Sequence, residues 1–110
     1  MTLQMFNLTG KRALITGSSQ GIGFALARGL AGAGAEIVLN GRDPSKLDAA
    51  TNILKDGHAI VHQLVFDVTD HEVVRAQVDG FEAKVGPIDI LINNAGMQHR
   101  AELHNFPADA

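Results

Sequence analysis

Four short apolar runs, separated by segments of helical periodicity, limit the folds open to this chain of 110 residues. Residues 12–16, 37–40, 60–66 and 88–92 are rich in β-branched side chains, which is typical of strands buried on both faces. Between these runs, apolar residues recur every three or four positions, as on amphipathic helices: Ile22, Leu26 and Leu30; Leu47, Ala50 and Leu54; Val74, Val78, Phe81 and Val85. The βαβαβαβ pattern predicts an α/β fold, a Rossmann-like doubly wound parallel sheet with strand order 3-2-1-4.

The ends of the predicted helices carry recognisable capping residues. Asp43 precedes Pro44, so its carboxylate is expected to cap the second helix, and Gly57 is expected to end that helix. Residues 69–72, Thr-Asp-His-Glu, match a capping box in which Thr69 begins the third helix. No linker interrupts the pattern, so residues 1–110 are predicted to belong to a single domain.

The charge and composition exclude several classes of partner. The net charge is −3 and the pI is near 5.9, whereas binding to a nucleic-acid backbone needs a basic surface. No apolar run approaches the roughly 18 residues of a membrane span, and the first residues do not resemble a secretory leader. The chain has no cysteine, which fits a reducing compartment. We expect a cytoplasmic protein that binds neither nucleic acid nor membranes.

A glycine-rich turn with the spacing G-x-x-x-G-x-G joins the first predicted strand to the first helix. Backbone N–H groups and the helix dipole form an anion site at such a position, and a pyrophosphate is the expected ligand. Gly17 would allow the tight turn, Gly21 would let a phosphate approach the backbone, and Gly23 would let the helix pack closely. The predicted cofactor-binding residues of the turn are Gly17, Ser18, Ser19, Gln20, Gly21, Ile22 and Gly23.

The same turn also matches G-x-S-x-G, the nucleophile elbow of α/β-hydrolases, with Ser19 as the nucleophile. A nucleophile elbow needs an upstream strand and loop to supply an oxyanion N–H group, and few residues precede this turn. The preferred role of Ser19 is therefore a hydrogen bond within the turn or to phosphate. A hydrolase stays as the alternative enzyme class.

A second motif, Asn93-Asn94-Ala95-Gly96, follows the fourth predicted strand. Together with residues 16–23 it resembles the T-G-x-x-x-G-x-G and N-N-A-G motifs of the short-chain dehydrogenase/reductase family. The resemblance covers essentially the whole chain and implies an NAD(P)-dependent oxidoreductase.

The resemblance implies a cofactor-binding role for five more residues, namely Asp67, Val68, Asn94, Ala95 and Gly96. The last three would line the cofactor near its ribose, and the Asp67 carboxylate would accept a hydrogen bond from the adenine amino group. The alternative role of Asp67 is to help cap the helix that opens at Thr69.

The family's catalytic group is an Asn, a Ser and a Tyr-x-x-x-Lys pair, all further along the chain than residue 110, with the tyrosine as general acid/base. This chain has no tyrosine, so no catalytic residue is assigned within residues 1–110. We expect a domain that is incomplete at its C-terminal end, from a longer protein that transfers hydride as a homotetramer. The chain by itself is expected to be a non-catalytic nucleotide-binding module that is poorly soluble, because its fourth strand would be an apolar, unpaired edge.

The end of the second strand bears on the choice between NAD and NADP. NAD-preferring dinucleotide folds place an acid there for the ribose 2′-OH, whereas an arginine accommodates a 2′-phosphate. Gly41 stands at the acid's position, and Arg42 follows as a permanently charged phosphate partner. Asp43 could bind the ribose instead, but its place before Pro44 favours helix capping. NADP is the expected cofactor, with NAD as the alternative because Gln20 stands where many NADP-preferring relatives carry a basic residue.

Five histidines raise the question of a metal site. His58 and His62 flank the entry to an extended strand, where an interval of four residues spans about 13 Å, so these two side chains cannot share an ion. We predict no metal ligand.

His99 and Arg100 follow the N-N-A-G motif at the carboxyl end of a parallel strand, where the ligands of open α/β sheets collect. Their functional role would be to bind a substrate carboxylate, and the alternative is that they are solvated loop residues. Residues 6–11, 40–43 and 94–100 also resemble members of the family that interconvert D-gluconate and 5-ketogluconate with NADP. The expected substrate is therefore a sugar acid or polyol.

Overall fold

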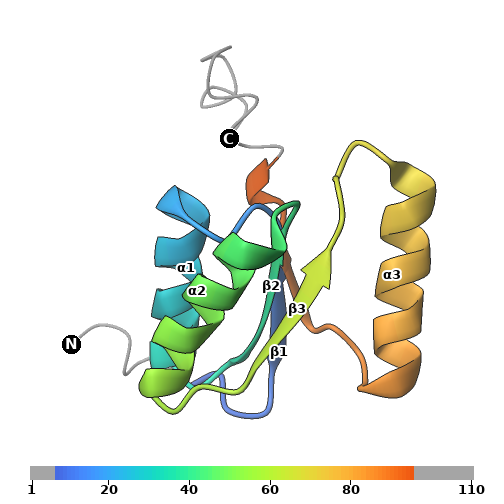
Figure 1. Cartoon of the computed structure of the whole chain (residues 1–110). Coiled ribbons are helices and arrows are strands. Elements are labelled where there is room, and N and C mark those ends of the chain that lie inside the picture. The colour runs from blue at the N-terminus through green and yellow to red at the C-terminus, as the bar shows by residue number, and fades with distance from the viewer. Residues whose placement is uncertain (1–6, 96–110) are drawn as a thin grey trace, which may run out of the picture.

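The computed structural model describes residues 7–95 and confirms the predicted α/β architecture (Figure 1). The elements in chain order are β1 (Arg12–Ile15), α1 (Gly21–Gly32), β2 (Glu36–Gly41), α2 (Pro44–Asp56), β3 (Val61–Val65), α3 (His71–Lys84) and β4 (Ile90–Ile92). All neighbouring strands are parallel, and their order in the sheet is β3-β2-β1-β4, as predicted. The carboxyl ends of β1, β2 and β3 therefore meet at one edge of the sheet.

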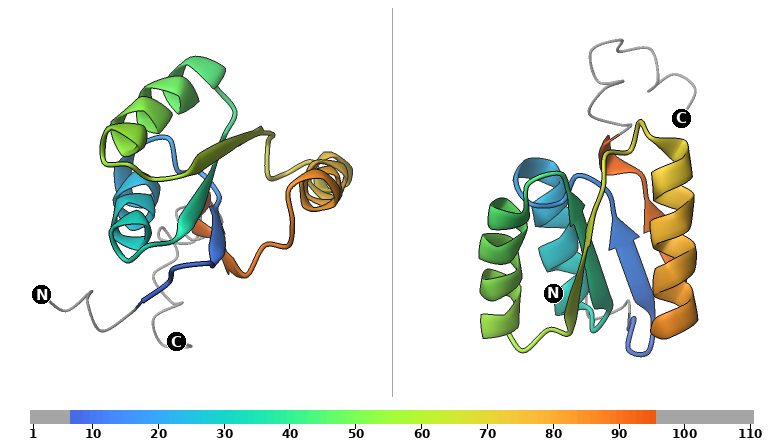
Figure 2. Two further views of the ribbon diagram at one scale, coloured as in Figure 1. Left: turned by 90° about the horizontal axis from the view of Figure 1, so that it is seen from below. Right: turned by 45° about the vertical axis from the view of Figure 1, so that its right-hand side comes forward.

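Helices cover both faces of the sheet, with α1 and α2 on one face and α3 on the other (Figures 1 and 2). Successive side chains of a strand point to opposite faces, so each strand contributes to two cores. The core under α1 and α2 contains Ala13, Ile15, Ala27, Ile37, Leu39 and Leu47. The core under α3 contains Leu14, Val38, Leu64, Phe66 and Phe81.

Helix α1 packs on the sheet through small residues, not through the stripe that its periodicity predicted. Gly23 and Ala27 are buried, whereas Ile22 is 64% exposed and Leu26 and Leu30 are half-buried. Small side chains let the helix axis approach the strands closely, so the buried side is turned by one residue from the expected one. The prediction that Ile22 belongs to the buried stripe is therefore wrong.

The two capping residues of α2 are the predicted ones, but the positive φ angle at the end of the helix belongs to a different residue. The Asp43 carboxylate accepts a hydrogen bond from the Ser45 N–H at 2.9 Å, as an N-cap does. Gly57 is the C-cap residue, as predicted, but the left-handed residue is His58, with φ +70°. The glycine therefore marks the end of the helix without supplying the positive φ angle.

Helix α3 begins one residue later than predicted. Its N-cap is Asp70, whose carboxylate accepts from the Val73 N–H at 3.3 Å, so the predicted capping box with Thr69 as its first residue is wrong. Thr69 instead donates both its N–H and its hydroxyl to Asp67 Oδ1, at 2.9 and 2.8 Å. Because Thr69 donates to Asp67, it does not cap α3, and these hydrogen bonds hold the loop that leads from β3 to α3.

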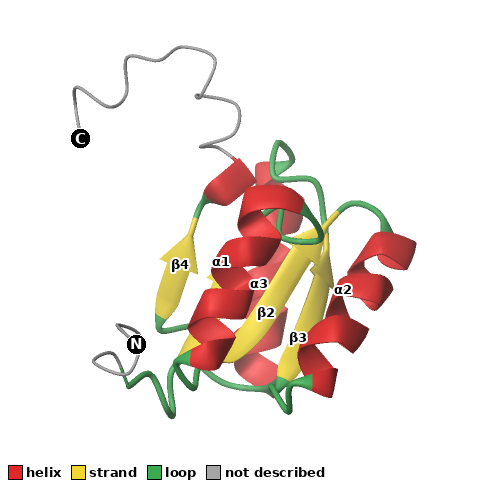
Figure 3. Cartoon of the chain, turned by 90° about the vertical axis from the view of Figure 1, so that its left-hand side faces the viewer, coloured by secondary structure: helices red, strands yellow, loops and turns green. Residues whose placement is uncertain are grey.

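Strand β4 forms one edge of the sheet within the described residues (Figure 3). It pairs with β1 along one side, and Leu91 is 65% exposed. Strand β3 forms the opposite edge, and the side chain of its Gln63 donates to Asp48 and Thr51 on α2. Within residues 7–95, no helix combines the length and the apolar character needed to cross a membrane.

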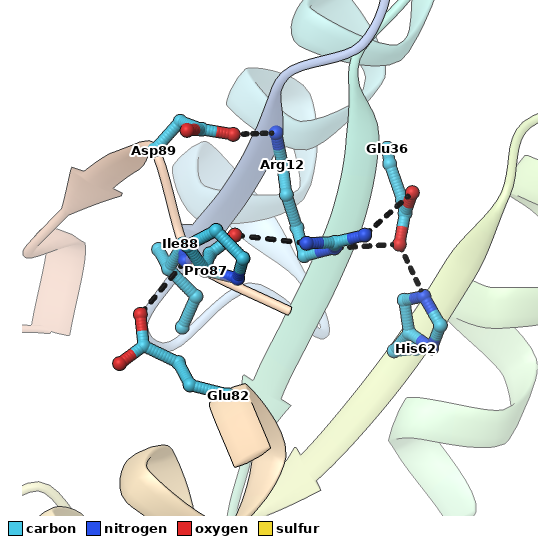
Figure 4. Close-up of polar contacts among 7 residues, drawn as sticks. All are labelled: Arg12, Glu36, His62, Glu82, Pro87, Ile88 and Asp89. Atoms are coloured by element: carbon cyan, nitrogen blue, oxygen red, sulfur yellow. Dashed lines mark hydrogen bonds and ion pairs between the residues drawn. The ribbon is translucent and has the colours of Figure 1, made fainter. Parts of the chain in front are cut away.

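Three ionisable side chains form a cluster at the amino ends of the strands, on the face covered by α3 (Figure 4). The Arg12 Nε atom and the His62 Nε2 atom lie 2.7 and 2.6 Å from the same Glu36 oxygen. Arg12 first and His62 second hold the pKa of Glu36 below its ordinary value. Arg12 also donates to the Pro87 carbonyl at 2.9 Å, so the cluster ties the strands to the segment between α3 and β4. We call Arg12, Glu36 and His62 the amino-edge cluster.

Candidate functional site

A cleft of about 670 Å³ opens at the carboxyl edge of the sheet, between the glycine turn and the ends of β2 and β3. Its lining includes eight of the residues that the sequence predicted for cofactor binding: Gly17, Ser19, Gln20, Gly21, Arg42, Asp67, Val68 and Ala95. The residues come from four separate loops. The parallel topology brings these loops together, because each follows the carboxyl end of a strand.

The three glycines of the turn do different work. Gly17 and Gly21 adopt left-handed φ angles of +59° and +65°, which favour glycine. A Cβ atom at Gly21 would meet no heavy atom within 4 Å, so the open space above it is available to a ligand. A Cβ atom at Gly23 would lie 2.3 Å from the Gly17 carbonyl oxygen and 2.6 Å from Asn94 Nδ2. Gly23 is thus required for α1 to pack against the turn itself.

Helix α1 differs from α2 and α3 at its N-terminus, which faces the cleft. The first N–H groups of a helix have no partner within the helix, and Asp43 and Asp70 cap those of α2 and α3. At the N-cap of α1, Gln20 makes no side-chain hydrogen bond, and the first turn contains no acid. An uncapped N-terminus with the positive end of its dipole beside a cleft is suited to an anion such as a diphosphate.

The N-N-A-G segment forms hydrogen bonds with the glycine turn. The Asn94 side chain is 1% exposed and donates to the Gly17 carbonyl at 3.0 Å, and the Ala95 N–H donates to Thr16 Oγ1 at 3.1 Å. Asn94 therefore acts on the turn, and only Ala95 of this pair lines the cleft. Gly96 lies outside the described residues.

The two serines of the turn have opposite environments. Ser18 is fully buried, and its hydroxyl donates to the Ile15 carbonyl at 2.6 Å, so its side chain stabilises the turn from within. Ser19 is half-buried and lines the cleft. Within residues 7–95 its hydroxyl makes no hydrogen bond to a histidine.

Arg42 and Asp67 face each other across the cleft. Arg42 Nη1 lies 3.8 Å from Asp67 Oδ2, and the two side chains are 78% and 44% exposed. The hydrogen bonds from Thr69 to Oδ1 are the main cause that lowers the pKa of Asp67, and Arg42 adds a smaller electrostatic effect. The carboxylate is therefore ionised at neutral pH, with Oδ2 directed toward Arg42. An exposed pair at this distance contributes little to stability, so the guanidinium can be engaged by a ligand.

The sequence model of the short chain dehydrogenases matches residues 11–110. The chain belongs to the short-chain dehydrogenase family.

Two curated members of the family are similar along most of this chain. The gluconate 5-dehydrogenase of Gluconobacter oxydans is 52% identical over 102 residues, and the 5-keto-D-gluconate 5-reductase of Escherichia coli K12 is 42% identical over 103 residues. The matches include 93% and 94% of this chain but 40% and 41% of those proteins. The chain thus spans about two fifths of the length of these short-chain dehydrogenases.

Solved short-chain dehydrogenase structures agree with the fold. A gluconate 5-dehydrogenase from Burkholderia cenocepacia, in complex with NADP and tartrate, superimposes with a TM-score of 0.75 at 52% identity, over 83% of this chain and 36% of that one. The L-sorbose reductase of Gluconobacter frateurii, in complex with NADPH and L-sorbose, gives a TM-score of 0.73 at 41% identity, over 78% and 33% of the two chains.

Membership of the short-chain dehydrogenase family removes support from the hydrolase alternative, since the glycine turn falls within the matched region. Among the described residues, no group of three metal-binding side chains lies together. His99 and Arg100, the predicted substrate residues, lie outside the described residues.

Several residues that line the cleft were not among the predicted site residues: Asn40, Gly41, Asp43, Lys46, Phe66, Thr69 and His71. Lys46 lies in the first turn of α2, directly after the loop that carries Arg42, so it brings a second cation to the cleft. Asn40 gave no local signal. Its role depends on contacts with residues more than 20 positions away.

Proposed function

We propose that the intact protein is an NADP-dependent oxidoreductase that interconverts D-gluconate and 5-ketogluconate. The observation that carries the proposal is the uncapped N-terminus of α1, which opens on the same cleft as Arg42. Support for the substrate comes from the gluconate 5-dehydrogenases and the 5-keto-D-gluconate 5-reductase that are similar to this chain.

The residues of the cleft fit a dinucleotide. The N–H groups at the start of α1 would hold the pyrophosphate, and the space above Gly21 would let it approach the backbone. Arg42 would bind the 2′-phosphate, and Asp67 would accept a hydrogen bond from the adenine amino group through the oxygen that Thr69 leaves open. When bound, NADP supplies or accepts the hydride that is exchanged with a secondary alcohol carbon.

The absence of tyrosine favours a more limited function for residues 1–110 by themselves. These residues would bind the nucleotide, and the family's Asn, Ser and Tyr-x-x-x-Lys group, further along the intact protein, would carry out the chemistry. In this proposal the 110 residues belong to one NAD(P)-binding domain, His99 and Arg100 contact the substrate carboxylate, and the intact protein is a cytoplasmic homotetramer.

The test is an assay of the intact protein in both directions, with NADP and alcohols and with NADPH and ketones, following the absorbance of NADPH. D-gluconate should give a higher kcat/KM than 2-dehydro-3-deoxy-D-gluconate in oxidation, 5-ketogluconate a higher kcat/KM than L-sorbose in reduction, and NADP a higher kcat/KM than NAD. A protein that reduces L-sorbose but leaves 5-ketogluconate unchanged would contradict the proposed substrate while leaving NADP binding intact. Residues 1–110 expressed alone should show no turnover.

A further inference from the structure

Asn40, near the end of β2, has a buried side chain whose amide is fully hydrogen-bonded. The residue is 1% exposed. Its Oδ1 atom accepts from the Gly17 N–H at 3.0 Å, and its Nδ2 atom donates to the carbonyls of Leu64 and Phe66 at 3.0 and 3.3 Å. Both amide hydrogens and the amide oxygen are therefore used, in contacts with two other segments of the chain.

The backbone of Asn40 adds two more bonds to the same turn. Its N–H donates to the Ser18 hydroxyl at 3.0 Å, and its carbonyl accepts from the Ser18 N–H at 2.8 Å. Asn40 thus joins the glycine turn and the end of β3 to the end of β2 through hydrogen bonds of both its side chain and its backbone.

The three joined segments carry the three parts of the cleft. The glycine turn holds the uncapped start of α1, β2 leads within two residues to Arg42, and Phe66 directly precedes Asp67. Any change in the spacing between these segments would move the groups proposed for the pyrophosphate, the 2′-phosphate and the adenine relative to one another.

We propose that Asn40 is a positioning residue for the adenine half of the cofactor, acting through the turn and the end of β3, because its side-chain amide is already engaged by Gly17, Leu64 and Phe66. The proposal rests on the proposed binding of NADP. An asparagine suits this position because one planar group must accept from an N–H and donate to two carbonyls. Aspartate would keep the acceptor but set a carboxylate oxygen against both carbonyls, and leucine would leave three buried polar groups unsatisfied.

The test compares two variants of the intact protein, Asn40→Asp and Thr51→Val. Thr51 is the matched control, because it is 6% exposed, accepts a hydrogen bond from Gln63 of β3, and does not line the cleft. Calorimetric titration with adenosine 2′,5′-bisphosphate probes the adenine half, and titration with reduced nicotinamide mononucleotide probes the other half. Thermal unfolding gives the stability of each variant.

We expect Asn40→Asp to raise the Kd for adenosine 2′,5′-bisphosphate about ten-fold or more, equivalent to about 1.4 kcal/mol, with the affinity for the nicotinamide mononucleotide unchanged. Thr51→Val should lower Tm and leave both Kd values unchanged. Equal losses for the two probes in Asn40→Asp, or a loss of bisphosphate binding in Thr51→Val, would reduce Asn40 to a general stabilising role and overturn the proposal.

If Asn40→Asp does not fold, Ser18→Ala decides the question, because it removes only the hydroxyl that bonds to the Asn40 N–H and the Ile15 carbonyl. It should show the same selective loss for the bisphosphate, on a scale of about two- to five-fold, and wild-type affinity in Ser18→Ala would overturn the proposal. A wild-type protein that binds neither NADP nor the bisphosphate would instead contradict the proposed function.

Discussion

The two ends of the sheet hold their polar side chains in different ways. At the amino edge, Arg12, Glu36 and His62 are ionisable and satisfy one another, within 2.6–2.7 Å of a shared carboxylate oxygen. At the carboxyl edge, Asn40 and Ser18 are neutral and bind mainly backbone groups. Strand β2 therefore takes part in a charged cluster at its amino end, through Glu36, and in a neutral network at its carboxyl end, through Asn40.

This difference between the two edges shows how the fold leaves a site open for an anionic ligand. In the amino-edge cluster each charge already has a partner, so the cluster holds the strands and the α3–β4 segment together. At the carboxyl edge the neutral network shapes the turn but leaves the start of α1 uncapped and the Arg42 side chain 78% exposed. Changes at the two edges should consequently separate ligand binding from stability.

The largest effect is expected for Gly23→Ala, which breaks the carboxyl edge. The added Cβ would lie 2.3 Å from the Gly17 carbonyl, a backbone atom that cannot move without distorting the turn. We expect NADP binding to be lost and the free energy of unfolding to fall by about 3 kcal/mol. Gly29→Ala is the control, since Gly29 lies in the same helix with nothing within 4 Å of the added atom, and it should stabilise the helix by about 0.5–1 kcal/mol. Calorimetry and denaturant unfolding of both variants measure the difference, and normal NADP binding by Gly23→Ala would refute the packing argument.

Arg42→Ala should weaken NADP binding without changing the stability of the protein. Loss of a charge-assisted hydrogen bond to the 2′-phosphate should weaken NADP binding by roughly 1.5–3 kcal/mol while NAD binding changes little. The pair with Asp67 is exposed, so the unfolding midpoint should stay the same. Titrations with both cofactors test this, with Arg28→Ala on α1 as a control that should bind NADP normally. Equal losses for NADP and NAD in Arg42→Ala would exclude the 2′-phosphate role.

Glu36→Gln should lower the stability of the protein without changing its affinity for NADP. Replacing the carboxylate that joins Arg12 and His62 should lower the free energy of unfolding at pH 7 by about 1–2 kcal/mol and leave the NADP affinity unchanged. Because Arg12 chiefly lowers the pKa of Glu36 below its ordinary value of 4.5, this stabilisation is present at neutral pH and is lost as the pH falls below 4.5.

Unfolding curves between pH 7 and pH 3 check the sign of this effect. The wild-type protein and Glu36→Gln should differ most at neutral pH and converge in acid. Asp79→Asn, an exposed acid of α3 outside the cluster, should follow the wild-type curve. A constant difference between Glu36→Gln and wild type across this range would show that the charge of Glu36 is not what stabilises the amino edge.

The smallest effect is expected for Gly41→Asp, which places an acid at the end of β2. A Cβ at Gly41 would lie in ordinary contact, 3.4 Å from Ser19 Oγ and 3.5 Å from Leu47, so the side chain fits. The new carboxylate should weaken NADP binding by about 1 kcal/mol through repulsion of the 2′-phosphate and should favour NAD. Gly41→Ala distinguishes the effect of an added side chain from the effect of its charge, and it should bind both cofactors as the wild type does. An unchanged NADP to NAD ratio in Gly41→Asp would place the 2′-phosphate elsewhere.

Local patterns sufficed to predict the strands, the Asp43 cap and the glycine turn, because each depends on residues close together in sequence. The strand order followed from the βαβ connections of a doubly wound sheet. The prediction that Thr69 caps α3 was wrong because Thr69 donates its hydrogen bonds to Asp67 instead. Likewise, the buried side of α1 follows from the small residues Gly23 and Ala27, which hydrophobic periodicity underweights.

Long-range contacts account for what the sequence did not predict at the candidate site. Asn40 reads as an ordinary polar residue at a strand end, and only the folded chain brings it to Gly17 and Leu64, 23 and 24 positions away. The pairing of His62 with Glu36 likewise joins residues 26 positions apart. Such pairings depend on the strand register, which single-residue patterns do not encode.

Hydrogen–deuterium exchange of the intact protein, with and without NADP, tests the central claim most directly. NADP should slow exchange in residues 17–23 and 40–43 at the carboxyl edge, where the uncapped amides and Arg42 lie. Exchange around Arg12, Glu36 and His62 at the amino edge should not change. Protection that appears at the amino edge, or no protection of the glycine turn at saturating NADP, would contradict the claim that the carboxyl edge holds the cofactor.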